Sequence, residues 1–373
     1  MRIDKVKVTN FRNLATQEVV FSPNINVFCG KNGAGKTNLL ESIYFVSIGR
    51  SPRTRKDGEC INFASKNAEI ALDYIRGEVV REVGISLSNR QDKKVILDGV
   101  PTSKINEIVG NFGSVYFSPD ETQIVRGSPS VRRRYIDIIN CQISKEYMHN
   151  LSRYQHAIIQ RNNYLKNKRP KEYTLELECW DNEISKACAL LIKRRALFVQ
   201  KISDLSNELH KILSTNKESI TLRYNTILDN PETKSMDEIM YVYTKGVKEC
   251  FKKDSLLGYS TFGAHNDDFD ITLNYLDTNN SIDLRKSGSL GQQRTATLAL
   301  KLAEVEILEE EYGEAPVLLL DDVLGELDET RKTKLMDFCS KFQTVITCTE
   351  WENLAPANLY KVENGIINKI LTD

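Results

Sequence analysis

Eight consecutive residues near the start of the chain have the composition of a phosphate-binding loop. Glycines let successive backbone N–H groups point at phosphate oxygens, and the positive end of a following helix adds to that field. Lys36 is the expected partner of the β- and γ-phosphates, and the Thr37 hydroxyl is the expected ligand of Mg²⁺. The segment predicts a site for ATP and Mg²⁺, and an ordinary Gly-rich turn is the alternative. It matches G-x-x-x-x-G-K-[ST] in full and consists of Gly30, Lys31, Asn32, Gly33, Ala34, Gly35, Lys36 and Thr37.

Two carboxylates follow an apolar run at 317–320. A continuous apolar strand is typical of a sheet that is buried on both faces. A carboxylate at the end of such a strand, beside a phosphate loop, can hold Mg²⁺, which is the role predicted for Asp321. Asp322 is expected to orient the attacking water, so Lys36, Asp321 and Asp322 are the predicted catalytic residues. A pair of surface acids after a strand is the alternative.

A third candidate lies at Ser289, Gly291 and Gln292, where a small hydroxyl residue and a glycine begin a helix predicted to run from Ser289 to Glu311. The N-terminus of a helix binds anions through its free N–H groups and its dipole. The alternative is a simple helix cap.

The elements around these motifs are predicted from periodicity. The phosphate loop lies between a compact strand at 25–29 and a helix from Thr37 to about Ser47. Short strands are predicted at 69–76, 79–88 and 93–98, with a turn at Asp98-Gly99. A further strand is predicted at 345–348, after the apolar strand at 317–320.

The middle of the chain has a different pattern. Apolar residues recur every three or four positions from Ile143 to Ile158, and Pro170 ends that stretch. A second seam, over about five heptads between Leu177 and Ile212, predicts one long helix. The two helices must lie antiparallel to bury their stripes. We therefore predict a helical arm at 121–261, with a strand at 219–227 and a helix at 236–253, inserted into a head made of 1–120 and 262–373.

The order of the motifs resembles the ABC-type ATPases. This resemblance implies an α/β head, a mixed sheet with helices, and two ATP molecules between the heads of a head-to-head dimer, each closed by the partner's serine-glycine signature. Asp328 resembles the aspartate of the D-loop. Asp322 replaces the family's catalytic glutamate, and Cys348-Thr349 stands where its switch histidine is expected. These departures favour slow hydrolysis that acts as a switch. Gln123 is the candidate for a glutamine loop.

An inserted, coiled-coil-like arm is similar to the SMC and Rad-fifty group, and several segments resemble the RecF family more closely. The resemblance implies an ATP-dependent DNA clamp in recombinational repair and replication restart, which acts with RecR and RecO in RecA loading and SOS induction. It also implies nucleotide contacts for Arg12, and a place near the base for Arg53 and Thr54. The segments are Asn10 to Leu14, Phe117 to Asp120, Gly127 to Pro129, Arg132 to Arg134 and Ser289 to Glu306.

One segment departs from that family. Gly263-Ala264-His265-Asn266 lacks the proline and the arginine that the RecF pattern has there. His265 with Asp267 and Asp268 suggests a metal site, and a loop that enters a strand is the alternative, which we prefer.

The charge of the chain is balanced overall and uneven locally. Lys plus Arg and Asp plus Glu both number 51, but Asp137 and Glu146 are the only acids between 126 and 170. A basic stripe along a helix can follow a DNA backbone without reading sequence. A solvated helix face, or arginines bound to the protein's own acids, is the alternative. The stripe consists of Arg126, Arg132, Arg133, Arg134, Lys145, Arg153, Arg161, Lys166, Lys168 and Arg169.

Other classes of protein remain open at this stage. Eight scattered cysteines without a C-x-x-C pair, a charged N-terminus and no long apolar run predict a cytoplasmic protein with reduced thiols and no membrane span. A nucleotide-binding subunit of another ABC-type system, such as a transporter, shares the core motifs but lacks a long arm. A metabolic P-loop kinase would not need the helix start at Ser289.

Overall fold

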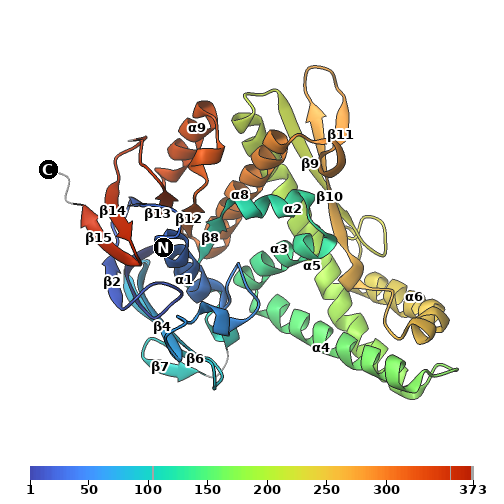
Figure 1. The fold of residues 1–373 in the computed structure, drawn as a ribbon. Helices are drawn as coiled ribbons and strands as arrows, with labels where there is room; N and C mark the ends of the chain where they lie inside the picture. The colour runs from blue at the N-terminus through green and yellow to red at the C-terminus, as the bar shows by residue number, and fades with distance from the viewer. Residues whose placement is uncertain (103–104, 353, 371–373) are drawn as a thin grey trace. The chain divides into compact units, whose positions relative to one another are not determined.

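The computed structural model describes residues 1–102, 105–352 and 354–370. Two compact units of mixed α/β structure are formed, the first from Met1–Glu121 with Thr297–Asp373 and the second from Thr122–Ala296 (Figure 1). Residues 262–296 thus pack with the second unit. The division into an ATPase head and an arm at 120 and 261 stays a prediction about function, since these units are defined only by contacts within the chain.

The phosphate loop belongs to a six-stranded sheet of the first unit, with the order β15-β14-β3-β13-β12-β8. All neighbours in it run parallel except β14 and β15. Strands β3, β12 and β13 are almost wholly buried, as their continuous apolar runs predict. The bounds are β3 Ile25–Cys29, β8 Ser114–Phe117, β12 Val317–Asp321, β13 Thr344–Cys348, β14 Asn358–Glu363 and β15 Ile366–Ile370.

A second six-stranded sheet of this unit is antiparallel throughout, in the order β2-β1-β4-β5-β6-β7. The predicted turn at Asp98-Gly99 is confirmed: it joins β6 to β7, and its φ values of 49° and 78° are both positive, as a two-residue hairpin requires. The bounds are β1 Arg2–Thr9, β2 Gln17–Val20, β4 Asn67–Arg76, β5 Val79–Ser88, β6 Lys94–Leu97 and β7 Val100–Thr102.

The helices of the first unit include α1 (Lys36–Ile48), α9 (Glu329–Cys339) and most of α8 (Leu290–Tyr312), whose first residues belong to the second unit. Short 3-10 turns lie at Asp57–Cys60, Ile105–Glu107 and Leu324–Glu326, and a further one, Pro119–Thr122, ends on the first residue of the second unit.

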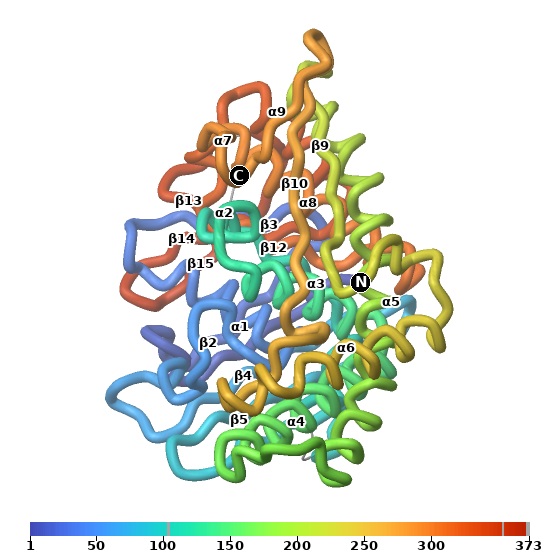
Figure 2. Tube along the Cα trace, turned by 90° about the vertical axis from the view of Figure 1, so that its right-hand side faces the viewer, coloured from blue at the N-terminus to red at the C-terminus, as the bar shows by residue number. Residues whose placement is uncertain are grey.

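The second unit is mainly helical, and its two long helices confirm the predicted seams. Helices α4 and α5 lie side by side and contact each other (Figures 1 and 2). Arg169, in the left-handed conformation before Pro170, ends α4, and the Thr174 hydroxyl caps α5. A capping box of Ser235 and Glu238 begins α6. The bounds are α2 Gln123–Arg126, α3 Pro129–Ile143, α4 Lys145–Lys168, α5 Leu175–Leu213, α6 Met236–Leu257 and α7 Leu284–Ser287.

A three-stranded sheet completes the second unit in the order β11-β10-β9. It pairs β9 (Glu218–Asn225) with β10 (Asp268–Tyr275), which pairs in turn with β11 (Ser281–Asp283). This pairing explains why residues 262–296 pack with the helices. Within the described ranges no helix has the length and apolarity needed to cross a membrane.

Candidate nucleotide site

The phosphate loop connects the end of β3 to the first turn of α1. Gly35 caps the helix with φ 116°, and an added Cβ there would lie 2.9 Å from Asn13 Oδ1, so a glycine is required. The Asn13 amide also donates to Gly33 O at 3.1 Å. Lys36 is 6% exposed and its Nζ donates to Gly30 O at 2.6 Å and to Lys31 O at 3.1 Å. The loop thus curls around the ammonium of its own lysine.

Asp321 lies beside the loop although it is 284 residues from Thr37 in the sequence. Thr37 Oγ1 donates to Asp321 Oδ1 at 2.9 Å, and the carboxylate is 5% exposed. Thr347 Oγ1 donates to the same oxygen at 2.7 Å, and the Tyr116 hydroxyl donates to Oδ2 at 2.8 Å. Burial, followed by the Asp321 charge, raises the pKa of Tyr116 well above its ordinary value. The structure therefore brings Thr37 and Asp321 together.

The two other Asp321 partners were missed by sequence reasoning. Thr347 was recognised only as a strand residue, and Tyr116 lies in β8, which was not predicted. Their strands flank β12 in the sheet. That adjacency was the missing information, since no local signal in the sequence gives the strand order.

Asp322 has a conformation that turns it away from the strand. Its φ is 55°, and its backbone N–H donates to Thr347 Oγ1 at 3.0 Å and to Thr347 O at 3.2 Å. A positive φ is uncommon for a residue with a side chain. Here it places Asp322 in the wall of the hollow over the phosphate loop.

Glu41 of α1 is a residue that the sequence analysis missed. It is fully buried and binds two arginines: Arg12 Nε and Nη2 donate to its two oxygens at 3.1 and 2.7 Å, and Arg53 Nη1 donates at 2.9 Å. A glutamate five residues after Lys36 offered no signal beyond its helical position. Arg12 thus donates hydrogen bonds to Glu41 and to Glu59 O. It is not among the residues that line the hollow over the phosphate loop.

The hollow over the loop has a volume of about 330 Å³ and a lining rich in polar groups. Arg53 and Asp322 face it together with the loop. Its lining residues are Asn32, Gly33, Gly35, Lys36, Thr37, Asn38, Arg53 and Asp322.

Ser289, Gly291 and Gln292 lie in the second unit, where they begin α8. Ser289 Oγ accepts from Gln292 N at 3.2 Å, and Gln292 Oε1 accepts from Ser289 N at 2.9 Å, which makes a reciprocal capping box. Gln292 Nε2 donates to Glu218 and to the Tyr275 hydroxyl. A Cβ added at Gly291 would meet nothing nearer than 4.0 Å, so this helix start is open to an approaching group.

Asp328 is the N-cap of α9. Its carboxylate accepts from the backbone N–H of Arg331 at 2.9 Å and forms an ion pair with the Arg331 side chain. Asp328 is not among the residues that line the hollow over the loop.

Two members of the predicted basic stripe do not face solvent, which corrects that prediction. Arg132 is 2% exposed and binds Asp268 through Nε at 2.6 Å. Arg161 is fully buried between Asp181, at 2.6 Å, and Asp254, at 2.9 Å. The stripe was predicted from charges that lie close together in the sequence. The acids that bind these two arginines come from more distant segments, which fold against the same helices.

The His265 segment forms a short turn, Ala264–Asn266, that leads into β10. His265 Nδ1 hydrogen-bonds the Tyr154 hydroxyl at 2.7 Å, and burial lowers the pKa of His265. Asp267 binds Arg195 at 3.1 Å, and Asp268 binds Arg132. Across the described ranges, no three His, Cys, Asp or Glu side chains are gathered as metal ligands.

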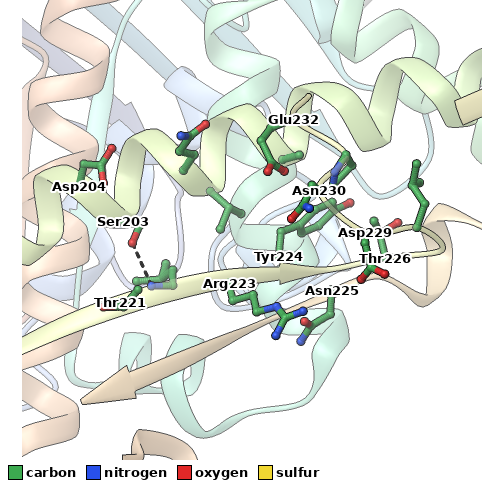
Figure 3. A pocket seen from close by; sticks show the side chains of 16 residues that line it. Ser203, Asp204, Thr221, Arg223, Tyr224, Asn225, Thr226, Asp229, Asn230 and Glu232 are labelled. Atoms are coloured by element: carbon green, nitrogen blue, oxygen red, sulfur yellow. Dashed lines mark hydrogen bonds between the residues drawn. The ribbon is translucent and has the colours of Figure 1, made fainter. Parts of the chain in front are cut away.

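A separate hollow of about 370 Å³ lies in the second unit between α5 and β9 (Figure 3). Two of its polar groups already serve the fold: Ser203 Oγ accepts from Leu222 N at 2.9 Å, and Thr226 Oγ1 donates to Asp267 at 2.7 Å. It is slightly larger than the hollow over the phosphate loop but lacks a comparable arrangement of a lysine, a hydroxyl and carboxylates. We therefore place the candidate site at the phosphate loop.

Comparisons with known proteins place this geometry in a family. A family model for the RecF/RecN/SMC N terminal domain matches residues 2–364. The DNA replication and repair protein RecF of Clostridium botulinum (strain 657 / Type Ba4) is 37% identical, over 99% of this chain and 100% of that protein. The chain belongs to the RecF family. RecF of Ruminiclostridium cellulolyticum is 35% identical over the full length of both chains.

Solved structures agree with this assignment. A structure of the recombination mediator protein RecF with ATP, in the RecFOR pathway, has a TM-score of 0.91 and 31% identity, covering 99% of this chain and 97% of that chain. The Smc head domain of Pyrococcus furiosus has a TM-score of 0.57 at 18% identity, covering 99% and 95%, which shows a shared fold. The predicted fold class, an ABC-type head with an inserted helical arm, is confirmed.

Proposed function

We propose that this RecF-family chain is an ATP-dependent DNA-binding protein of recombinational repair and replication restart. ATP would bind at the loop of Gly30 to Thr37 and join two copies head to head as a clamp on DNA. RecR and RecO as partners, RecA loading and SOS induction belong to this proposal through the family. The observation that carries it is the contact of 2.9 Å between Thr37 and Asp321 beside the phosphate loop.

The residues present fit Mg²⁺. Thr37 Oγ1 and Asp321 Oδ1 are hard oxygen donors that already converge, and Mg²⁺ prefers such ligands, one or two from protein with the rest from phosphate and water. Bound there, Mg²⁺ would supply charge neutralisation at the β- and γ-phosphates. Tyr116 and Thr347 would hold the Asp321 carboxylate in its orientation.

The remaining steps fall to the chain's own groups. Lys36 would leave the carbonyl oxygens of Gly30 and Lys31 for the phosphates, and the backbone N–H groups of the loop would bind the same oxygens. Asp322 would orient the attacking water. Because its side chain is one methylene shorter than the glutamate of related ATPases, we propose slow hydrolysis that opens the dimer, more a switch than a motor.

The dimer is proposed to close when the α8 start of one copy meets the γ-phosphate held by the other. The open N-terminus at Ser289 and Gly291 supports this, because its dipole and free N–H groups favour an anion. Asp328 and Arg12 are proposed as further contacts to the nucleotide or across the interface.

Light scattering tests this proposal on the full chain. Molar mass is measured without nucleotide, with ADP, and with a non-hydrolysable ATP analogue, each with and without duplex DNA. We expect the molar mass to double with the ATP analogue, but not with ADP or without nucleotide. We expect the resulting dimer to retain duplex DNA. A monomer in every condition would refute the dimer.

Ser289→Arg is expected to keep ATP binding by the monomer and to block the dimer, since a long cationic side chain fills the open helix start. The decisive readout is the molar mass with the ATP analogue. Leu290→Ala is the matched control, because this neighbouring side chain is 47% exposed. A normal ATP-dependent dimer of the Ser289→Arg variant would disprove the interface assignment.

We propose that the DNA contact lies toward one end of the arm. The end of α4, the following linker and the end of α6 meet there, since Ser255 Oγ donates to Pro170 O at 2.6 Å. Six exposed cations gather at this end, and none of the six forms an ion pair with a described residue. The exposed acids near them are Glu172, Glu176 and Glu249, the last of which pairs with Lys245. The cations are Lys166, Lys168, Arg169, Lys171, Lys252 and Lys253. The last two come from α6, and neither they nor Lys171 were part of the predicted stripe.

The double variant Lys168→Glu/Arg169→Glu is expected to weaken duplex binding and to flatten its salt dependence. For every DNA phosphate that the variant no longer neutralises, the slope of log K against log salt should decrease in magnitude by about 0.9. Fluorescence anisotropy at several salt concentrations measures this. Lys245→Glu, at an exposed position of α6, is the control. An unchanged slope in the double variant would exclude this end of the arm as a DNA-binding surface.

A further inference from the structure

Two cysteines lie opposite each other at the edge of the sheet where the phosphate loop begins. Cys29 ends β3 directly before Gly30, and Cys348 ends β13. They are register partners on neighbouring parallel strands, and their Sγ atoms are 3.5 Å apart. Neighbouring strands are about 4.8 Å apart, which lies inside the range of Cα separations of about 4.4 to 6.8 Å that a disulfide spans.

The two thiols are chemically unequal. The hydrogen bond with Cys348 lowers the pKa of Cys29, and the nearby Lys36 ammonium acts in the same direction. The same hydrogen bond, together with burial, raises the pKa of Cys348. Cys29 is also the more accessible of the two, since it is half-buried whereas Cys348 is buried. Cys29 is therefore suited to be the attacking thiolate and Cys348 the resolving thiol. Burial instead raises the pKa of Cys60, Cys188 and Cys339.

We propose that Cys29 and Cys348 are a modification site at which a peroxide forms a disulfide that weakens nucleotide binding at the adjoining phosphate loop. First, the Cys29 thiolate attacks a peroxide oxygen: an S–O bond forms, the O–O bond breaks, and the oxygen that leaves takes a proton to become water. The Cys348 sulfur then attacks Cys29: the S–S bond forms, the S–O bond breaks, and the released hydroxide takes the Cys348 proton. Two thiols and one hydrogen peroxide give one disulfide and two waters.

The loop is built so that this bond would disturb it. Closing the sulfurs from 3.5 Å to about 2.05 Å requires both side chains to rotate at the strand ends that hold the loop. Gly30 has little room to adapt, since a Cβ added there would lie 2.3 Å from Val362 O. Gly30 O accepts from Lys36 Nζ, and Gly30 N donates to Cys348 O at 3.3 Å. Thr347, the residue before Cys348, donates a hydrogen bond to Asp321.

Mass spectrometry tests the bond itself on the full-length chain. The reduced protein is treated with hydrogen peroxide, then alkylated and digested. We expect the intact mass to fall by about 2 Da, as two thiol hydrogens are lost, and a peptide that links Cys29 to Cys348. Cys348→Ser should instead leave a dimedone-reactive sulfenic acid at Cys29. Cys179→Ser, at an exposed position, is the control and should still form the bond. Oxidation of Cys179 without a 29–348 link in the unsubstituted chain would overturn the proposal.

The effect on the loop rests on the proposed function and is measured separately. Titration with a fluorescent ATP analogue should show at least tenfold weaker binding after peroxide, restored by dithiothreitol. Cys348→Ser should not show this reversible loss relative to its own reduced form. If the disulfide forms and the affinity for the ATP analogue does not change, the proposed effect of the disulfide on the phosphate loop is wrong, while the proposal of ATP binding stands. A reduced protein that binds no nucleotide would instead refute the proposed function, while the linked peptide still decides the thiol pair.

Discussion

Lys36→Ala is expected to lower the affinity for ATP by at least a hundredfold. Each charge-assisted hydrogen bond from the ammonium to a phosphate contributes about 1.5–3 kcal/mol, and every 1.4 kcal/mol is about tenfold in affinity. The side chain is 6% exposed and lies inside the loop. Arg53, the other cation that lines the hollow, is bound to Glu41 and Asn38.

The measurement is an equilibrium titration with a fluorescent ATP analogue. Lys56→Ala is the matched control, because its side chain is 83% exposed and its carboxylate partner, Glu59, is 3.9 Å away. Circular dichroism of both variants should match the unsubstituted chain, which separates loss of binding from loss of folding. Affinity within threefold of the original would mean that the lysine does not contact phosphate and that the segment is an ordinary turn.

Arg195→Met is expected to destabilise the second unit by about 3–5 kcal/mol, the usual cost of leaving buried charges without their partner. Arg195 is 3% exposed and donates hydrogen bonds to four partners at once, one of them the Tyr147 hydroxyl at 3.1 Å. Its Nε and Nη2 donate to Asp137 at 2.9 and 3.0 Å, and its Nη1 donates to Asp267 at 3.1 Å and to Ala264 O at 2.6 Å. Methionine fills part of the space but satisfies none of these oxygens.

The neighbouring residue provides the control for this variant. Arg194 is 51% exposed, and its ion pair with Glu146 is 3.6 Å long, so Arg194→Met should change stability by less than about 1 kcal/mol. Urea unfolding followed by Trp180 fluorescence, in a Trp351→Phe background, reports on the second unit. Equal losses of unfolding free energy in both variants would show that the buried bonds of Arg195 contribute no more to stability than the exposed ion pair of Arg194.

The same variant has an expected pH dependence. Burial already raises the pKa of Asp267, and Arg195 opposes that shift. Without Arg195 the folded pKa rises further above the unfolded value, so the unfolded chain releases its proton first as pH rises. Relative to the unsubstituted chain, the deficit in free energy of unfolding should therefore grow as pH rises from the folded pKa of Asp267 in that chain, already above its ordinary value, to the higher folded pKa in the variant. A deficit that is constant with pH would contradict the electrostatic cause.

Several features were predictable because their signals are local. The loop from Gly30 to Thr37 lies between a strand and a helix, and the structure has both. The heptads from Leu177 predict a helix found at Leu175–Leu213, because burial of one helix face repeats every three or four residues. The turn at Asp98-Gly99 was predictable because Asp-Gly suits the positive φ that both positions adopt. Each of these features depends on residues a few positions apart.

Other features required the tertiary structure. Arg161 looked like part of a basic surface, yet Asp181 and Asp254 bury it, the latter 93 residues away. The Glu41 cluster and the Cys29–Cys348 contact likewise join residues that share no local pattern.

The sequence by itself determined the chemistry of the phosphate loop and the periodic helices of the arm, since both are encoded within single segments. Only the tertiary structure decided which charges are free and which side chains surround Asp321. The order of strands in a sheet sets those neighbours, and that order comes from packing of the whole unit, not from the pattern of any one strand.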